Sequence, residues 1–185
     1  MKRAQLSLII LLIIILTSAP VALAQAPPFD VDAAAAVLLD YDSGQILYNK
    51  NGSDVRVPAS LVKVMTMFIA MDHIKAGRIG LSDTTRVSEA AWRMTGSKMF
   101  LEVGETVTVE QLLQGIAVVS GNDACVALAE ALAGSTEVFV QWMNRKASDL
   151  GLSMRFADVH GLSESNQMTA LDMAYLARAY IRIHP

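Results

Sequence analysis

Residues 58–66 carry the sequence PASLVKVMT, where an apolar run that predicts a buried helix begins. Ser60 and Lys63 are three residues apart, which places them one turn apart on the same face of that helix. A serine hydroxyl becomes a nucleophile when a neighbouring base takes its proton, and burial lowers the pKa of a lysine toward that of such a base. Because S-x-x-K arises by chance about once in a chain of this length, the match alone favours a surface serine and a lysine on an amphipathic helix.

A second polar motif, Ser120-Gly121-Asn122, lies between two apolar segments at 109–118 and 122–133. Thr108 and Gln111 form a capping box that predicts the start of the first segment as a helix. A loop inside a buried helical layer brings polar side chains to a place where water is scarce, which is unusual without a function. Two helix caps around a glycine hinge explain the same residues about equally well.

The predicted elements are two strands followed by helices, which indicates a single domain of the α+β class. Strands at 33–40 and 45–50 flank the turn Asp42-Ser43-Gly44 and form an antiparallel hairpin. Such a hairpin is marginal in water by itself, so we expect further strands or a covering helix. Residues 78–107 show no regular pattern. Helices are predicted at 58–75, 109–118, 122–133, 137–150 and from Thr169 onward, and the apolar 109–118 helix is expected at the centre.

The first 24 residues have the features of a secretory signal peptide. Lys2 and Arg3 precede an apolar run, and Ala22-Leu23-Ala24 forms a small-x-small cleavage site. An uncleaved membrane anchor is the alternative, although the run is short for a spanning helix. We therefore expect export to the periplasm or the outer face of the cytoplasmic membrane, and a mature domain of residues 25–185.

Composition limits the classes of function. The formal net charge is −3, and no basic stripe suits nucleic acid. The single cysteine, Cys125, cannot form an intrachain disulfide, and we expect it to be a small buried residue rather than a catalytic thiol. Cysteine and histidine are too few and scattered for a familiar zinc pattern, so no metal or other cofactor is predicted.

S-x-x-K followed by S-x-N resembles the signature of penicillin-binding proteins and serine β-lactamases. The stretches PASLVKVMT and SGNDAC (120–125) are similar to those of low-molecular-mass D-alanyl-D-alanine carboxypeptidases. The same holds for LDYDSG (39–44), GSKMFL (96–101), HGL (160–162) and TALDMA (169–174). This resemblance covers essentially the whole mature chain. It implies the penicillin-binding/β-lactamase-like transpeptidase fold, in which a helical layer lies on an antiparallel sheet.

The resemblance also implies a role for each motif residue. Ser60 is acylated by the penultimate D-alanine of peptidoglycan stem peptides ending in D-Ala-D-Ala, and by β-lactams. Lys63 accepts the serine proton, and Ser120 passes it to the leaving amine. Asn122 holds the substrate amide and tethers Lys63. His160 is expected to orient the site or to be structural. The family uses no cofactor.

One family motif has no counterpart. No Lys-Thr-Gly or Lys-Ser-Gly triplet follows Ser120-Gly121-Asn122, and we expect the chain to be the N-terminal portion of a carboxypeptidase. In this interpretation residues 25–185 are an incomplete catalytic domain, without its C-terminal sheet strands and without the C-terminal segment that associates with the membrane. Because the third motif is absent, we expect the chain by itself to show no detectable D-alanine release. A serine β-lactamase is the enzymatic alternative, disfavoured by Gly121 and by the absence of a deacylating glutamate, which Glu164 does not supply. A non-catalytic homologue that binds the cell wall is the other.

Overall fold

The predicted hairpin is the first element of the structure. In the computed structural model, which describes residues 29–185, β1 (Ala36–Leu39) pairs antiparallel with β2 (Ile46–Lys50). The turn between them is fixed by Asp40, whose carboxylate accepts hydrogen bonds from the Ser43 amide and hydroxyl. The signal peptide predicted for residues 1–24 lies outside the described residues. Residues 32–185 form one unit.

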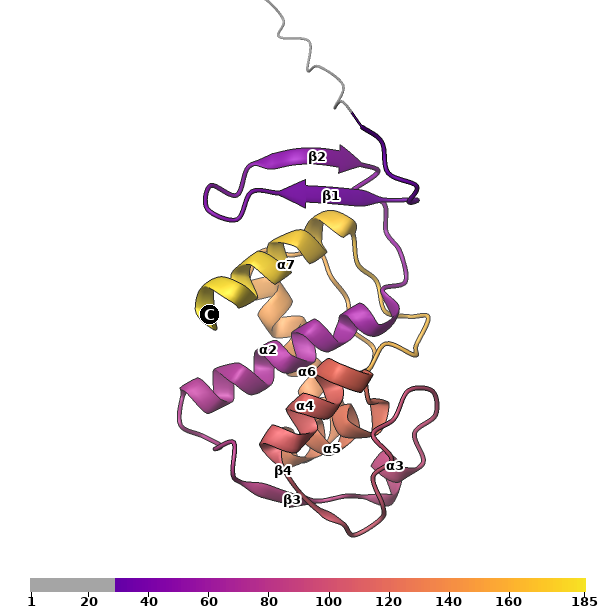
Figure 1. Cartoon of the computed structure of the whole chain (residues 1–185), viewed down its shortest axis with the longest axis vertical. Coiled ribbons are helices and arrows are strands. Elements are labelled where there is room, and N and C mark those ends of the chain that lie inside the picture. The colour runs from indigo at the N-terminus through magenta and orange to yellow at the C-terminus, as the bar shows by residue number, and fades with distance from the viewer. Residues whose placement is uncertain (1–28) are drawn as a thin grey trace, which may run out of the picture. The chain divides into compact units, whose positions relative to one another are not determined.

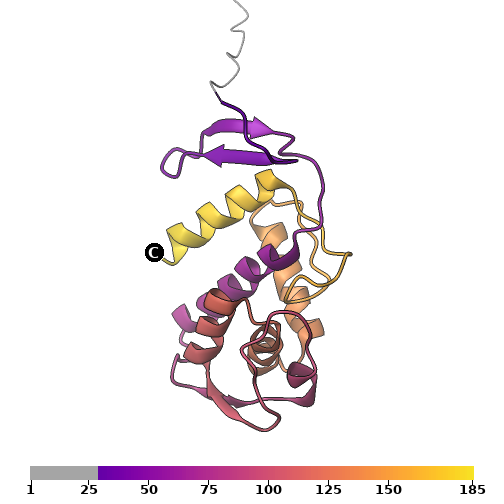
Figure 2. The ribbon, with the colours of Figure 1, turned by 45° about the vertical axis from the view of Figure 1, so that its right-hand side comes forward.

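A helix covers the hairpin. α7 (Ala170–Ile183) packs against β1, and both views of the ribbon show the two side by side (Figures 1 and 2). Its start is capped, because the Thr169 hydroxyl accepts a hydrogen bond from the third amide of the helix. The Arg178 guanidinium then donates to the carbonyls of Tyr41 and Asp42 at 2.7 and 3.0 Å. Within residues 29–185 the hairpin has two strands, and the helix supplies its cover.

The helix predicted to begin at Pro58 starts differently. A 3₁₀ turn, η1 (Ala59–Leu61), precedes α2 (Val62–Lys75). Ala59 has φ +48°, a left-handed backbone conformation that cannot continue into an α-helix. Ser60 therefore lies in a tight turn ahead of the helix and not in its first α-helical turn.

The region that lacked a sequence pattern contains a second small sheet. β3 (Thr84–Arg86) pairs antiparallel with β4 (Thr106–Thr108), and α3 (Glu89–Trp92) lies between them in the chain. These elements are too short to produce a detectable period. β4 leads directly into α4 (Val109–Val119), whose N-terminus carries the predicted capping box.

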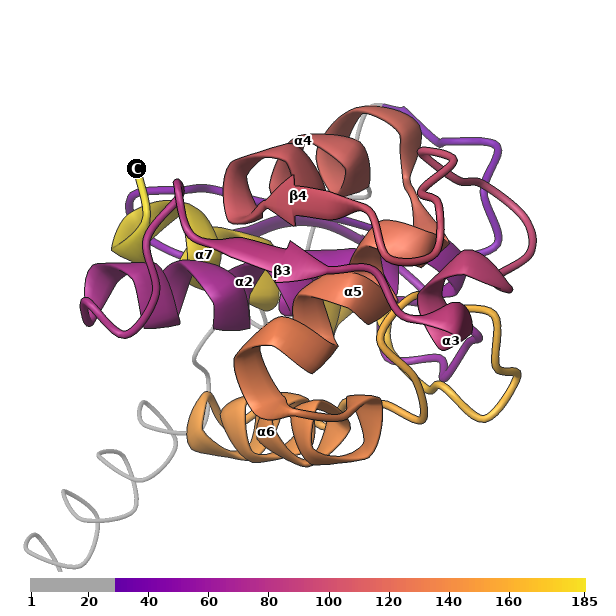
Figure 3. The same ribbon diagram turned by 90° about the horizontal axis from the view of Figure 1, so that it is seen from below.

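The central helix is α5 (Asn122–Ala133), and the prediction that the 109–118 helix would be central was wrong. Every residue from 122 to 129 is buried, whereas Val118 at the end of α4 is 80% exposed. Small alanine side chains on α5 allow α2, α4 and α6 (Thr136–Asp149) to approach it closely. Figure 3 shows α5 between α4 and α6. The apolar character of α4 therefore does not correspond to complete burial.

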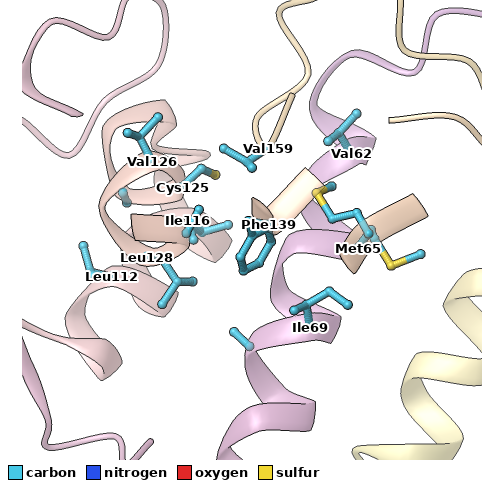
Figure 4. Close-up of a cluster of buried hydrophobic side chains, with 14 of the residues drawn as sticks. Val62, Met65, Ile69, Leu112, Ile116, Cys125, Val126, Leu128, Phe139 and Val159 are labelled. Carbon is cyan, nitrogen blue, oxygen red and sulfur yellow. The ribbon is translucent and has the colours of Figure 1, made fainter. Parts of the chain in front are cut away.

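Side chains from four helices, α2, α4, α5 and α6, form the hydrophobic core. They point toward one another between α2 and the α4–α5 pair (Figure 4). Each fully buried large side chain contributes about 1.5–3 kcal/mol of transfer free energy. The largest of them include Met65, Phe68, Leu112, Leu128, Phe139 and Met143. In the part of the chain that is described, no helix has the length and hydropathy needed to cross a membrane.

Candidate active site

Three of the four predicted site residues meet at one point. Lys63 Nζ lies 3.2 Å from Ser60 Oγ, and Ser120 Oγ donates a hydrogen bond to the same oxygen at 3.2 Å. Ser60 comes from η1, Lys63 from the first turn of α2, and Ser120 from the end of α4. Ser120 ends that helix with φ +57° and ψ +38°, a left-handed conformation that interrupts the helical course of the chain. The Ser60 hydroxyl therefore has an amine and a second hydroxyl within hydrogen-bonding distance.

Lys63 is held in a buried position beside Ser60. Its side chain is buried, with a residue exposure of 4%, and its second hydrogen bond goes to the His160 carbonyl at 2.7 Å. Burial lowers the pKa of Lys63, and the charge of the facing Asp158 acts in the opposite direction. Burial also raises the pKa of the Cys125 thiol to about 12, so this thiol is neutral near pH 7. Cys125 is a buried residue, as predicted, with no free thiolate.

The Ser60 backbone amide is a second feature of the site. No residue of the described chain accepts a hydrogen bond from it. It lies at the start of α2, where free amides and the helix dipole favour negative charge. The Ser60 amide can thus donate to an oxyanion that forms on a carbonyl attacked by the Ser60 hydroxyl.

Asn122 differs from its predicted arrangement. Its side-chain amide donates to the Thr95 carbonyl at 2.7 Å, and its backbone amide donates to the Ser97 carbonyl at 2.8 Å. Among the described residues it makes no hydrogen bond to Lys63, so the expected tether is absent and the His160 carbonyl holds the amine instead. The reason is geometric: Asn122 is the first residue of α5, and its side chain reaches the loop that carries Thr95.

Asp123, the next residue, was missed by the sequence analysis. It is fully buried, and its carboxylate accepts hydrogen bonds from the amides of Met99 and Leu101 at 3.0 and 3.2 Å. The Ser120-Gly121-Asn122 motif and its neighbour therefore fix the loop from Thr95 to Leu101 beside the site. The similarity of GSKMFL (96–101) to the family was visible in the sequence, but nothing in it indicated this anchor.

The loop around His160 also borders the site. The predicted orienting role of His160 belongs to its carbonyl, because the ring is occupied locally: Nδ1 accepts a hydrogen bond from the Leu162 amide. Burial lowers the pKa of the His160 imidazole, and although Asp158 opposes this, the net direction is downward. Glu164 is exposed on the same loop.

A cavity of about 390 Å³ opens behind this loop, between α3, α5 and α6. His160 and Asp158 border it, but Ser60, Lys63 and Ser120 do not. In residues 29–185, no three side chains of His, Cys, Asp or Glu are grouped so that they could hold a metal ion.

Comparison with solved structures shows the class of protein to which the fold belongs. The fold is that of penicillin-binding proteins, as predicted. Penicillin-binding protein 5 from Haemophilus influenzae matches with a TM-score of 0.83 and 39% identity, covering 85% of this chain and 47% of that one. The D-alanyl-D-alanine carboxypeptidase DacD from Francisella tularensis matches with a TM-score of 0.81 and 43% identity, covering 83% and 38%.

The family follows from the sequence profile. The profile Peptidase_S11, described as D-alanyl-D-alanine carboxypeptidase, matches residues 21–185, and the chain belongs to this family. D-alanyl-D-alanine carboxypeptidase DacF of Bacillus subtilis (strain 168) is 44% identical over 189 aligned positions, which cover 98% of this chain and 48% of that protein. DacC of Escherichia coli (strain K12) is 44% identical over 163 positions, 84% of this chain and 41% of that one. The chain spans less than half the length of these relatives.

Proposed function

We propose that this chain carries the nucleophile, base and proton relay of a serine-type D-alanyl-D-alanine carboxypeptidase, which removes the terminal D-alanine from peptidoglycan stem peptides. The convergence of Lys63 Nζ and Ser120 Oγ on Ser60 Oγ, each at 3.2 Å, is the observation that carries the proposal. The family match supports the substrate class.

The first step is proton transfer from Ser60 to Lys63. A neutral amine has two hydrogens and one lone pair. One hydrogen remains in the hydrogen bond from Lys63 Nζ to the His160 carbonyl oxygen, which are 2.7 Å apart. The lone pair accepts the serine proton. The lowered pKa of Lys63, due to burial, makes the neutral amine accessible. The serine oxygen then bonds to the penultimate D-alanine carbonyl, and the Ser60 amide stabilises the oxyanion.

The second step breaks the peptide bond. The nitrogen of the terminal D-alanine leaves with a proton, which Ser120 passes to it from Lys63 in this proposal; the hydrogen bond from Ser120 Oγ to Ser60 Oγ supports this role. Water then attacks the acyl-enzyme, releases the shortened peptide and restores the Ser60 hydroxyl. Asn122 holds the substrate amide in this proposal, which requires its side chain to exchange the Thr95 carbonyl for the substrate. No metal or other cofactor takes part.

β-Lactams are proposed to acylate the same serine. Penicillin-binding protein D2 from Listeria monocytogenes, described in its ampicillin-bound form, matches with a TM-score of 0.77 and 26% identity, covering 86% of this chain and 65% of that one. We also propose that the chain is exported, with cleavage after Ala24, so that the domain meets peptidoglycan outside the cytoplasmic membrane. N-terminal sequencing of exported protein should then begin at Gln25, and a chain that retains Met1 in the membrane fraction would indicate an anchor.

Intact-mass measurement tests the function. We incubate the chain and its Ser60→Ala variant with benzylpenicillin, and separately measure D-alanine release from a peptide ending in D-Ala-D-Ala. The proposal expects a stable penicillin adduct that depends on Ser60, whereas D-alanine release from this chain is expected to be absent because no Lys-Thr-Gly or Lys-Ser-Gly triplet follows Ser120-Gly121-Asn122. Rapid penicillin hydrolysis without a lasting adduct identifies a β-lactamase. If the chain forms no adduct and shows no turnover, the enzymatic proposal is refuted and a non-catalytic binding homologue is the remaining interpretation.

A further inference from the structure

The turn that presents the His160 carbonyl is built on one carboxylate. Asp158 Oδ1 accepts hydrogen bonds from the His160 amide at 3.1 Å and from the Gly161 amide at 2.6 Å, and Oδ2 accepts one from the Ser163 amide at 2.6 Å. Burial by itself raises the pKa of Asp158, but these amide donors and the neighbouring His160 together outweigh it, so the net direction is downward. The turn therefore closes around an ionised carboxylate at neutral pH.

A buried amide closes the loop from the other side. Asn166 is fully buried, and its Oδ1 accepts a hydrogen bond from the Ala157 amide at 2.8 Å. Its Nδ2 donates to Asp158 Oδ1 at 3.2 Å and to the Ser163 carbonyl at 2.9 Å. Together Asp158 and Asn166 satisfy the amides inside the loop, which leaves its outer carbonyls free to make contacts elsewhere.

Those carbonyls are what hold the loop to α2. The Val159 carbonyl accepts a hydrogen bond from the buried Thr66 hydroxyl at 2.7 Å, and the His160 carbonyl accepts one from Lys63 Nζ at 2.7 Å. Thr66 follows Lys63 by three residues, so the two donors share one face of α2. The position of the loop and the position of the Lys63 amine are thus coupled.

We propose that Asp158 is a positioning residue for Lys63: by folding residues 158–163 around its carboxylate it aims the His160 carbonyl at Nζ and holds the amine against Ser60. This inference rests on the proposed function only in taking Lys63 to be the base. Asp158 does not touch Ser60, and nothing in the sequence motifs or in the comparisons assigns it a role.

The charges that face Lys63 define what the removal of Asp158 does. Cys125 on α5 is neutral because its pKa is about 12, and His160 on the loop has a lowered pKa and is neutral near pH 7. Asp158 is then the negative charge among the groups that face the amine. Both its charge and the carbonyl that it positions favour the ammonium form of Lys63, so losing either lowers the pKa of Lys63.

The test compares Asp158→Asn with Glu164→Gln, which removes a carboxylate from the exposed part of the same loop. NMR titration of the Lys63 side chain, in protein labelled with ¹³C at lysine Cε, measures its pKa without requiring catalysis. We expect Asp158→Asn to lower this midpoint by about one pH unit and Glu164→Gln to leave it in place. The acid limb of penicillin acylation should move down by the same interval, with a plateau rate about tenfold or more slower.

A second variant covers the case in which Asp158→Asn does not fold. Asn166→Ser keeps the Asp158 charge but opens the loop, and we expect a smaller downward shift of the Lys63 midpoint. An unchanged midpoint in a folded Asp158→Asn protein, or in folded Asn166→Ser where the first variant is unfolded, overturns the proposal. If the Lys63 midpoint shifts in the variant but the wild-type chain is not acylated by penicillin, the positioning role of Asp158 stands and the proposed function is refuted.

Discussion

Gly161 is the position at which one added methyl group should disable the site. It has φ +96°, and a Cβ built there would lie 1.9 Å from the Ala59 carbonyl oxygen and 2.4 Å from its carbon. Non-bonded heavy atoms prefer roughly 3.5 Å, so the two backbones must separate by about 1.6 Å. The left-handed conformation costs an alanine about 1–2 kcal/mol, and the overlap adds about 3 kcal/mol. Because Ala59 precedes Ser60, the separation also displaces the nucleophile.

Gly151→Ala is the matched control, because Gly151 has φ +70° but no atom within 4 Å of an added Cβ. It carries the conformational cost without the overlap. In a domain of this size about 1 kcal/mol lowers the melting temperature by about 2–4 °C, so we expect a drop of about 5 °C for Gly151→Ala and about 15 °C for Gly161→Ala. Penicillin labelling of folded Gly161→Ala should slow about a hundredfold, while Gly151→Ala labels normally. Equal melting temperatures and equal labelling rates for the two variants would refute this reasoning.

Three other changes test separate parts of the structure. Lys63→Arg should abolish penicillin acylation as completely as Ser60→Ala while leaving the melting temperature near that of the wild type, because arginine keeps its proton at any accessible pH; labelling at a normal rate would exclude the lysine as the base. Asp123→Ala should lower the free energy of unfolding in urea by about 2–4 kcal/mol, because it leaves buried backbone amides without an acceptor; a loss below about 0.5 kcal/mol would contradict the anchor. The folded-state pKa of Asp158 is lowered from 3.8, so the ionised carboxylate stabilises the fold above its unfolded pKa and loses this effect as pH falls through its folded pKa. Melting temperatures measured from pH 5 downward should therefore fall less steeply for Asp158→Asn than for the wild type, and parallel curves would contradict this.

The sequence was sufficient to predict the centre of the site, because the spacing of its residues is set by a helix. Ser60 and Lys63 are three residues apart across the 3₁₀ turn η1 and the first turn of α2, and a single helical turn brings residues at that spacing to the same face. Ser120 follows from the break between two apolar helices, which α4 and α5 confirm. The hairpin and the capping box of Thr108 and Gln111 were predictable for the same reason: each depends on a few neighbouring residues.

Contacts made across the fold could not be predicted in this way. The carbonyl that holds Lys63 belongs to His160, 97 residues later, and a backbone carbonyl has no residue-specific signature. The partner of Asn122 is likewise the Thr95 carbonyl. The central position of α5 depends on how closely its alanines let other helices approach, whereas the apolarity of α4 measures composition alone. Asp158 resembles any turn-forming aspartate until the loop is seen against α2.

Backbone conformation joins these separate segments into one site. Ala59 and Ser120 have positive φ, as does Gly161, and each lies at the point where its segment reaches Ser60 or its hydrogen-bond partners. Such conformations cost non-glycine residues about 1 kcal/mol or more and persist only where surrounding packing determines them. A regular helix through Ala59 would place Ser60 in line with α2, and a regular helix through Ser120 would continue α4 past the nucleophile. The buried helices on either side of these positions thus stabilise the backbone conformations that bring serine, lysine and serine together.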